Sequence, residues 1–262
     1  WRVSASPMMI FGSLLIGFII DWVGIWGAFA FMGTSLVIGL PFLLLIHVHG
    51  SVDSSSTNLF KQTLEGARYA VRDPSLRTLF SVSVVMETLG FSFLVMIPVM
   101  AKTVLETGGT GLGVLQAGVG AGMLGATLLM AAYGDSVSKA KIIVVCAMGA
   151  GVALVAFALS RSLPLSVVLA GAVMGFLNAY DLSLGAMMQL VSPPHLRGRA
   201  VSLHSLAISF TALGGFAIGV LGGIVGVPLV MAVGGGGIIA NATLRRRAVL
   251  NLREQRVEPP VE

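Results

Sequence analysis

Two carboxylates, Glu87 and Asp181, interrupt long apolar segments of this sequence. An ionisable side chain near the centre of a lipid bilayer costs about 2.5–3.5 kcal/mol, so it normally faces a cavity or a partner. Each carboxylate lies ten residues from the polar end of its segment, at Arg77 and Val191, which is about 15 Å at 1.5 Å per residue. This matched depth suits a group that takes up and releases a proton. The alternative is a carboxylate satisfied by a neighbouring hydroxyl or amide.

Other polar side chains accompany these carboxylates. Asn178 lies three residues before Asp181 and therefore shares its helix face, with Tyr180 and Ser183 on either flank. These side chains either hydrogen-bond a substrate or join helices, and the spacing leaves both alternatives open. Gln116, early in its own apolar segment, is a further candidate for the same pathway.

A second set of charged residues lies between apolar segments. Asp135 and Lys139 form one candidate gate, although an ordinary turn aspartate explains Asp135 equally well. Arg197 and Arg199 either dock against helix C-termini, where the helix dipole favours cations, or simply anchor the topology. His204 stands about five residues inside its span and is expected at headgroup level rather than in a proton relay.

The composition indicates that these residues belong to a membrane protein. The chain has 262 residues, 56% hydrophobic and 10% charged, with 34 glycines and a mean hydropathy of +0.95. Such values indicate an all-α, polytopic membrane helix bundle and exclude a soluble protein. The one cysteine, Cys146, has no histidine or cysteine cluster near it, so neither a metal site nor any cofactor is predicted.

Eight spans follow from the need for about 20 apolar residues to cross the bilayer. They are expected near residues 5–21, 24–46, 77–101, 111–133, 141–160, 164–190, 200–222 and 226–243. The last is weakened by four consecutive glycines at 234–237. Glycines four apart predict close helix contacts at 118/122, 171/175 and 215/219/223, and the glycine-rich run 108–113 is interpreted as a loop.

Basic residues fall almost entirely on one side of these spans. Fourteen of the 16 lysines and arginines lie in one set of loops, and only Lys102 and Arg161 lie in the other. The rich side is therefore expected to be cytoplasmic, with both ends of the chain on it. The net positive charge is then explained by contact of these basic residues with the lipid bilayer, so no nucleic-acid partner is predicted.

The longest polar run divides the chain. Residues 1–46 would hold two helices, 47–76 a cytoplasmic linker with an amphipathic helix, 77–243 six helices, and 244–262 a basic cytoplasmic tail. Asp73 and Pro74 are expected to cap and begin the first helix after the linker. The chain starts with Trp1 rather than Met and is expected to begin inside a longer protein.

Three local sequences resemble major facilitator superfamily transporters of the bacterial drug and siderophore exporter branch. Residues 65–74 (EGARYAVRDP) are similar to the stretch before helix 7, and 194–203 (PHLRGRAVSL) resemble the loop between helices 10 and 11. Residues 134–141 (GDSVSKAK) resemble the loop signature between helices 8 and 9, without its arginine and second glycine. The chain would then correspond to helices 5 to 12.

The resemblance implies a secondary active transporter in the bacterial inner membrane, with no enzymatic activity. It implies proton-coupled efflux of a small amphipathic molecule by alternating access, with helices 7 and 10, and hence Glu87 and Asp181, lining the central cavity. The missing N-terminal helices of the parent chain would be its assembly partner. The alternative to a transporter is that this polypeptide itself transports nothing and is a truncated membrane fragment or an assembly partner. An intramembrane enzyme is disfavoured, because on a helix neither Ser202 nor Ser205 would face His204.

Overall fold

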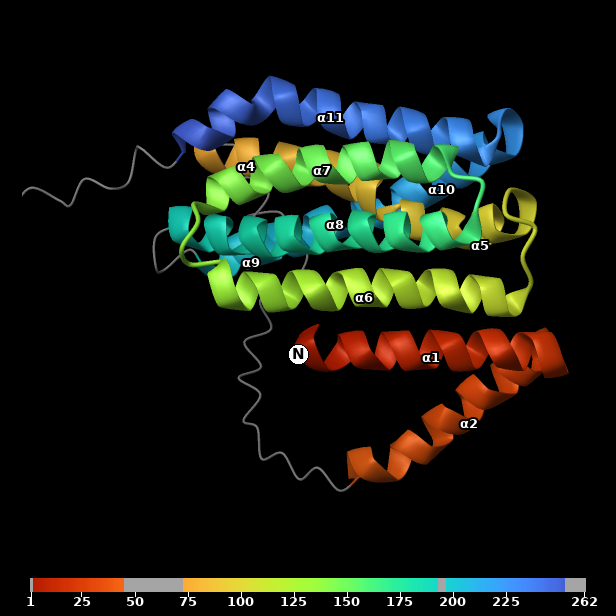
Figure 1. The fold of residues 1–262 in the computed structure, drawn as a ribbon. Helices are drawn as coiled ribbons and strands as arrows, with labels where there is room; N and C mark the ends of the chain where they lie inside the picture. The colour runs from red at the N-terminus through yellow and green to blue at the C-terminus, as the bar shows by residue number, and fades with distance from the viewer. Residues whose placement is uncertain (1, 45–72, 193–196, 253–262) are drawn as a thin grey trace, which may run out of the picture.

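The computed structural model describes residues 2–44, 73–192 and 197–252, and all regular elements in these ranges are helical (Figure 1). The elements in chain order are α1 (Arg2–Val23), α2 (Ile25–Leu44), α4 (Pro74–Val85), η1 (Met86–Phe91), α5 (Phe93–Thr103), α6 (Gly109–Tyr133), α7 (Lys139–Leu159), α8 (Leu163–Val191), α9 (Arg197–Ile208), α10 (Phe210–Val225) and α11 (Val227–Asn251). The predicted amphipathic helix of the linker and most of the basic tail lie outside the described residues.

Membrane-length helices occupy the positions that hydropathy predicts. Six of them within the described ranges are long and apolar enough to cross a membrane: 74–103, 109–133, 139–159, 163–191, 200–225 and 227–251. The apolar parts of α1 and α2 are shorter, at Met8–Val23 and Ile25–Ile38. The predicted all-α bundle with about eight spans is therefore confirmed.

Two of the spans are broken near their middle. The span from Pro74 to Thr103 contains the π-helical turn η1, which separates α4 from α5. The span that begins in α9 changes to α10 at Ser209, whose N–H bonds to Leu206 instead of the carbonyl four residues back. π-helical turns are rare and occur frequently at functional sites, so both breaks bear on the site described below.

The ends of the helices follow local sequence rules in part. Asp73 accepts hydrogen bonds from the backbone N–H groups of Ser75 and Leu76 at 2.8 and 3.3 Å, and Pro74 opens α4, as predicted. The prediction of a loop over 108–113 is wrong, because Gly109 already begins α6. The four glycines at 234–237 do not interrupt α11.

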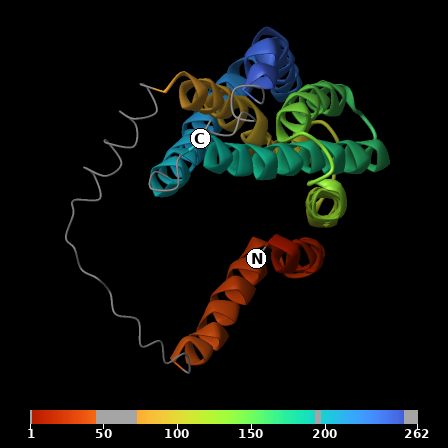
Figure 2. The ribbon, with the colours of Figure 1, turned by 90° about the vertical axis from the view of Figure 1, so that its left-hand side faces the viewer.

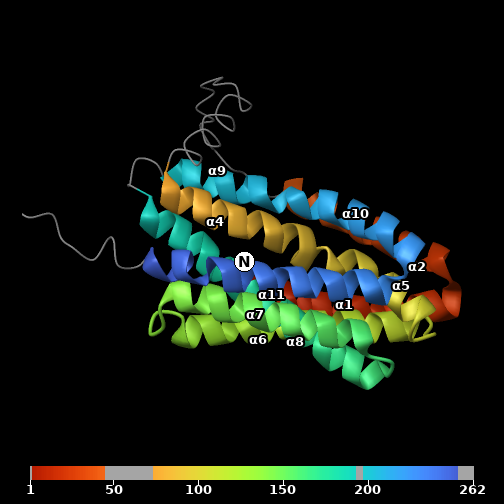
Figure 3. The same ribbon diagram turned by 90° about the horizontal axis from the view of Figure 1, so that it is seen from above.

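The helices from α4 onwards form one bundle, and α1 packs along its side against α6 (Figures 1 and 2). The most extensive contacts join α1 to α6, α6 to α8, α8 to α7, and α7 to α11. α2 leads away from the bundle after the turn at Gly24 (Figures 1 and 2). One end of the bundle, at the left in Figures 1 and 3, gathers the start of α4, the end of α6, the start of α7 and the ends of α8 and α11.

Glycines bring the backbones of α6 and α8 into direct contact. A Cβ added to Gly118 would lie 2.7 Å from the Val167 oxygen, and one added to Gly171 would lie 2.8 Å from the Gly118 oxygen. A Cβ on Gly122 would overlap the carbonyl group of Gly171. The predicted small-residue contact between these two helices is confirmed, whereas Gly223 has no atom near enough to need its small size.

We expect Gly122→Ala to lower the free energy of unfolding by about 1–3 kcal/mol, because the added methyl forces α6 away from α8. Gly125→Ala on the same helix is the matched control, since a Cβ there meets nothing within 4 Å. Thermal unfolding in detergent micelles compares the two variants. Equal midpoints for both variants would show that the backbone contact does not hold α6 on α8.

Candidate functional site

Asp181 of α8 and His204 of α9 form a buried pair. The Nε2 atom of His204 lies 3.1 Å from Oδ1 of Asp181, and their side chains are 17% and 6% exposed. His204 is seven residues beyond the start of α9, about 10 Å along the helix, and its ring turns inward toward α8. The sequence did not predict this contact with Asp181, and the expected headgroup-level depth of His204 stays a prediction. A carboxylate and an imidazole at this distance can share or exchange a proton.

A polar vestibule leads to this pair. It is a cavity of about 590 Å³ lined by Asp135 of the α6–α7 connection, by Lys139 at the start of α7, by residues 182, 185, 186, 189 and 190 of α8, and by Asp181 and His204. Because Asp135 and Lys139 follow the end of α6, the vestibule opens at the end of the bundle where α6 and α8 finish (Figure 1). The cavity connects that end with the Asp181 carboxylate, which lies ten residues before the end of α8, about 15 Å along its axis.

A salt bridge stands at the mouth of the vestibule. Lys139 Nζ lies 3.0 Å from Asp135 Oδ1 and also donates a hydrogen bond to the Gly134 carbonyl at 2.5 Å. The Asp135 carboxylate is fully exposed, so this pair is a weak contact that solvent screens. The structure thus brings these two predicted gate residues together. The side chains of the other two, Arg197 and Arg199, lie outside what the structure describes.

Glu87 lies in a different environment. It is in the π-helical turn η1, is only 3% exposed, and accepts a hydrogen bond from the Thr211 hydroxyl of α10 at 2.5 Å. Ser92 Oγ donates to the Thr88 carbonyl at 2.6 Å and approaches that of Thr211 at 3.3 Å. Glu87 and Asp181 were predicted to lie at matching depth, but their partners differ: a threonine hydroxyl for Glu87 and a histidine ring for Asp181.

Both helix breaks meet at Glu87. A Cβ on Gly214 of α10 would collide with the Thr88 carbonyl and with the Ser92 hydroxyl, so only glycine allows this approach. Thr211 follows the interruption at Ser209 by two residues. The site at Glu87 is consequently a tight crossing of two irregular helices.

Tyr180 lies between the environments of the two carboxylates. Its side chain is completely buried, it is within electrostatic range of both Asp181 and Glu87, and its hydroxyl has no hydrogen-bond partner among the described residues. The hydroxyls of Ser83 in α4 and Ser183 in α8 are also buried, and they have no hydrogen-bond partner among the described residues. An unpaired buried hydroxyl is unfavourable, so water or a bound polar group would satisfy these atoms.

The remaining two predicted pathway residues lie elsewhere. Asn178 Nδ2 donates to Thr127 Oγ1 at 2.8 Å and to the Met123 carbonyl at 3.1 Å, so it joins α8 to α6. Gln116 lines a cavity of about 530 Å³ between α6, α1 and α2. The structure therefore divides the five predicted pathway residues among an Asp181 site, a Glu87 site, the α6–α8 contact and the α1–α6 side.

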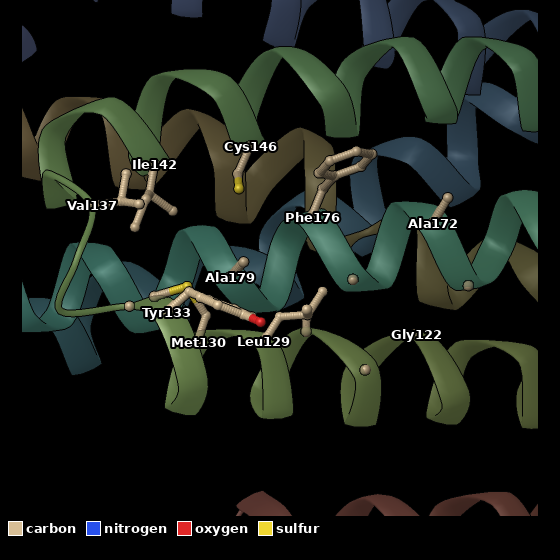
Figure 4. Close-up of a pocket in the computed structure, with 15 residues that line it drawn as sticks. Gly122, Leu129, Met130, Tyr133, Val137, Ile142, Cys146, Ala172, Phe176 and Ala179 are labelled. Atoms are coloured by element: carbon tan, nitrogen blue, oxygen red, sulfur yellow. The ribbon is translucent and has the colours of Figure 1, made fainter.

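An apolar groove of about 630 Å³ runs between α6, α7 and α8 (Figure 4). Leu129 and Tyr133 of α6 and Phe176 of α8 line it together with Cys146 of α7. Figure 4 shows these side chains around an open space that Gly122 of the α6–α8 contact also lines. The residues that line this groove include no ionisable group other than the thiol and the phenol, unlike the vestibule, which holds a carboxylate next to an imidazole.

Sequence reasoning missed three participants of these sites: His204, Thr211 and the π-helical turn. Spacing along one helix gives no information on which neighbouring helix a side chain faces. The only available signal was the occurrence of a histidine and a threonine in apolar segments, where each polar group needs a partner.

Comparison with known proteins gives one match. The sequence model of a family described as transmembrane secretion effector matches residues 9–260. No curated protein and no solved structure matches the chain.

We expect the Asn178–Thr127 hydrogen bond to stabilise the α6–α8 contact by about 0.6 kcal/mol, and by no more than about 1.7 kcal/mol, as such bonds do in membranes. A double-mutant cycle with Asn178→Leu and Thr127→Val measures this coupling in the free energy of unfolding. Thr103→Val removes a hydroxyl that is exposed and bonded within its own helix, so its effect should add to that of Asn178→Leu. Complete additivity in the first pair would contradict a direct bond.

Proposed function

Because the chain belongs to the transmembrane secretion effector family, a family of major facilitator-type transporters, we propose that it serves proton-coupled efflux of a small amphipathic molecule. The family is one of multi-pass membrane transporters, and we infer no enzymatic activity from it. The proposal adds the direction, the coupling ion and the type of substrate. Alternating access about a midplane site is the mechanism that we infer, with drug-like compounds or siderophores as cargo.

The observation that carries the proposal is the Asp181–His204 pair at the inner end of the vestibule. A carboxylate at mid-depth is costly when charged, and the imidazole partner and the polar cavity reduce that cost. A proton bound by Asp181 neutralises it and weakens its attraction to His204. Cargo with a positive or hydrogen-bonding group would compete with the proton for the same carboxylate, which couples the two fluxes.

Glu87 has a separate role in this proposal. The Thr211 hydroxyl covers its carboxylate, and Gly214 packs directly on the neighbouring backbone, so Glu87 holds α10 on η1. Irregular turns such as η1 and the break at Ser209 absorb changes of backbone angle when helices tilt. Glu87 is therefore proposed as the group that fixes a hinge between the two broken helices, while Asp181 exchanges protons.

The Asp135–Lys139 pair is proposed as a gate at the vestibule mouth, with Arg197 and Arg199 as further gate cations. The end of the bundle that carries the vestibule is the one rich in basic residues, including Arg77, Lys141 and Arg245–Arg247. By the positive-inside preference this end faces the cytoplasm of a bacterial inner membrane. Protons released into the vestibule would then leave toward the cytoplasm, as exchange against exported cargo requires.

We expect Asp181→Asn to abolish proton-driven efflux, because an amide at this position cannot bind and release a proton. The measurement is efflux of a panel of lipophilic cations and siderophores from proteoliposomes under an imposed pH gradient, with the abundance of each variant checked. His204→Gln should shift the pH dependence and lower the rate by about tenfold, since it removes the partner but not the carboxyl.

Two further variants make this measurement selective. Glu106→Gln removes an exposed carboxylate in the α5–α6 connection and should transport like the parent. Glu87→Gln should lower thermal stability while the number of protons per cargo molecule stays unchanged. Proton-coupled efflux that survives in Asp181→Asn would refute the assignment of the coupling site.

A further inference from the structure

The N-terminus of α6 is capped by a side chain from another helix. Oδ1 of Asp21, in the last turn of α1, accepts a hydrogen bond from the Gly109 N–H at 2.6 Å, and Oδ2 accepts one from the Thr110 N–H at 2.6 Å. The first N–H groups of a helix have no partner within the helix, and the helix dipole favours an anion there. The residue at the capping position, Gly108, has no side chain to offer. Asp21 therefore supplies the capping carboxylate that the sequence of α6 lacks.

The backbones of α1 and α6 are in contact next to this cap. A Cβ added to Gly17 would lie 2.6 Å from the Gly109 oxygen, and one added to Gly113 would lie 2.7 Å from the Ser13 oxygen. A Cβ added to Gly108 would lie 2.9 Å from Oδ1 of Asp21. Glycines on both helices thus allow the short carboxylate to reach the helix end.

The two helices belong to different parts of the fold. α6 is integrated in the bundle through α8, whereas α1 lies on the outside of α6 and continues into α2 (Figures 1 and 2). α6 has 25 residues, so the Asp21 cap and the vestibule mouth at Asp135 lie about 36 Å apart along its axis. The cap therefore closes the α1–α6 contact at the end of the bundle opposite the open vestibule.

We propose that Asp21 and the N-terminus of α6 form a latch that keeps the end opposite the vestibule closed, and that this latch must open for cargo to leave. The inference rests on the proposed function for the meaning of that opening, because an alternating-access transporter needs one end closed while the other is open. Hydrogen bonds from backbone N–H groups to a carboxylate are among the stronger ones. The latch nevertheless opens reversibly, because Asp21 and Thr110 are exposed and water replaces each as partner.

The test measures the separation of α1 from the bundle directly. Spin labels are placed at Val23→Cys and Arg161→Cys, two exposed positions at the latch end, in the full chain with Cys146→Ser, and their distance distribution is recorded in nanodiscs. We expect Asp21→Asn to lower the ratio of short to long distances by about tenfold, the effect of losing one charge-assisted hydrogen bond. Glu106→Gln, which removes an unrelated carboxylate at the same end, should leave the ratio unchanged.

A second variant keeps the latch testable if Asp21→Asn assembles poorly. Thr110→Pro removes one of the two donors in the first turn of α6, where proline is tolerated, and should shift the ratio in the same direction. Combined with Asp21→Asn it should add little, because both substitutions break one contact. A distance distribution that Asp21→Asn and Thr110→Pro both leave like that of the parent would overturn the latch.

The distance measurement needs neither cargo nor a proton gradient. If the latch variants open while Asp181→Asn still transports normally, the latch stands and the proposed coupling site fails. If Asp181→Asn loses coupled efflux while the distances do not change in the latch variants, the coupling site stands and the latch fails.

Discussion

A carboxylate within a membrane helix must have a partner, and this requirement organises the described part of the chain. The described helices contain three acidic residues, Asp21, Glu87 and Asp181. Their partners are backbone N–H groups, a threonine hydroxyl and a histidine ring. Each partner belongs to a different helix from its carboxylate, so these contacts fix which helices meet. At Glu87 and Asp181, which are buried, the partner also makes the charge tolerable, whereas Asp21 is exposed at the end of its helix.

The chemistry of the partner separates the roles of these carboxylates. A hydroxyl or a backbone N–H donates one hydrogen bond and does not titrate near neutral pH, whereas an imidazole gains and loses a proton there. Only the Asp181 pair, among the three, opens on the polar vestibule. Depth in the membrane alone would make Glu87 and Asp181 equivalent, and it is their partners and access to water that distinguish them.

Hydropathy was sufficient to predict the membrane-length helices in the described ranges, because length and apolar composition are properties of single segments. It was insufficient for the rotation of a helix about its axis, which decides that His204 faces Asp181 and that Asn178 faces Thr127. The π-helical turn was equally hidden, since it depends on contacts with α10 that lie more than a hundred positions away. The glycine-rich run 108–113 was interpreted as a loop and contains no capping side chain of its own, since the N-terminus of α6 is capped by Asp21, a residue of another helix.

Glycine contacts provide a mechanical connection between the vestibule and the latch. α8 carries Asp181, and its backbone rests on that of α6 at Gly118, Gly122 and Gly171 without intervening side chains. α6 in turn rests on α1 at Gly109 and Gly113. Contacts between backbones do not adjust by rotamer changes, so a tilt of α8 in the proposed transport cycle would carry α6 with it and strain the Asp21 bonds at its far end. In that proposal, a change of charge at Asp181 would bias the proposed latch through the two helix contacts.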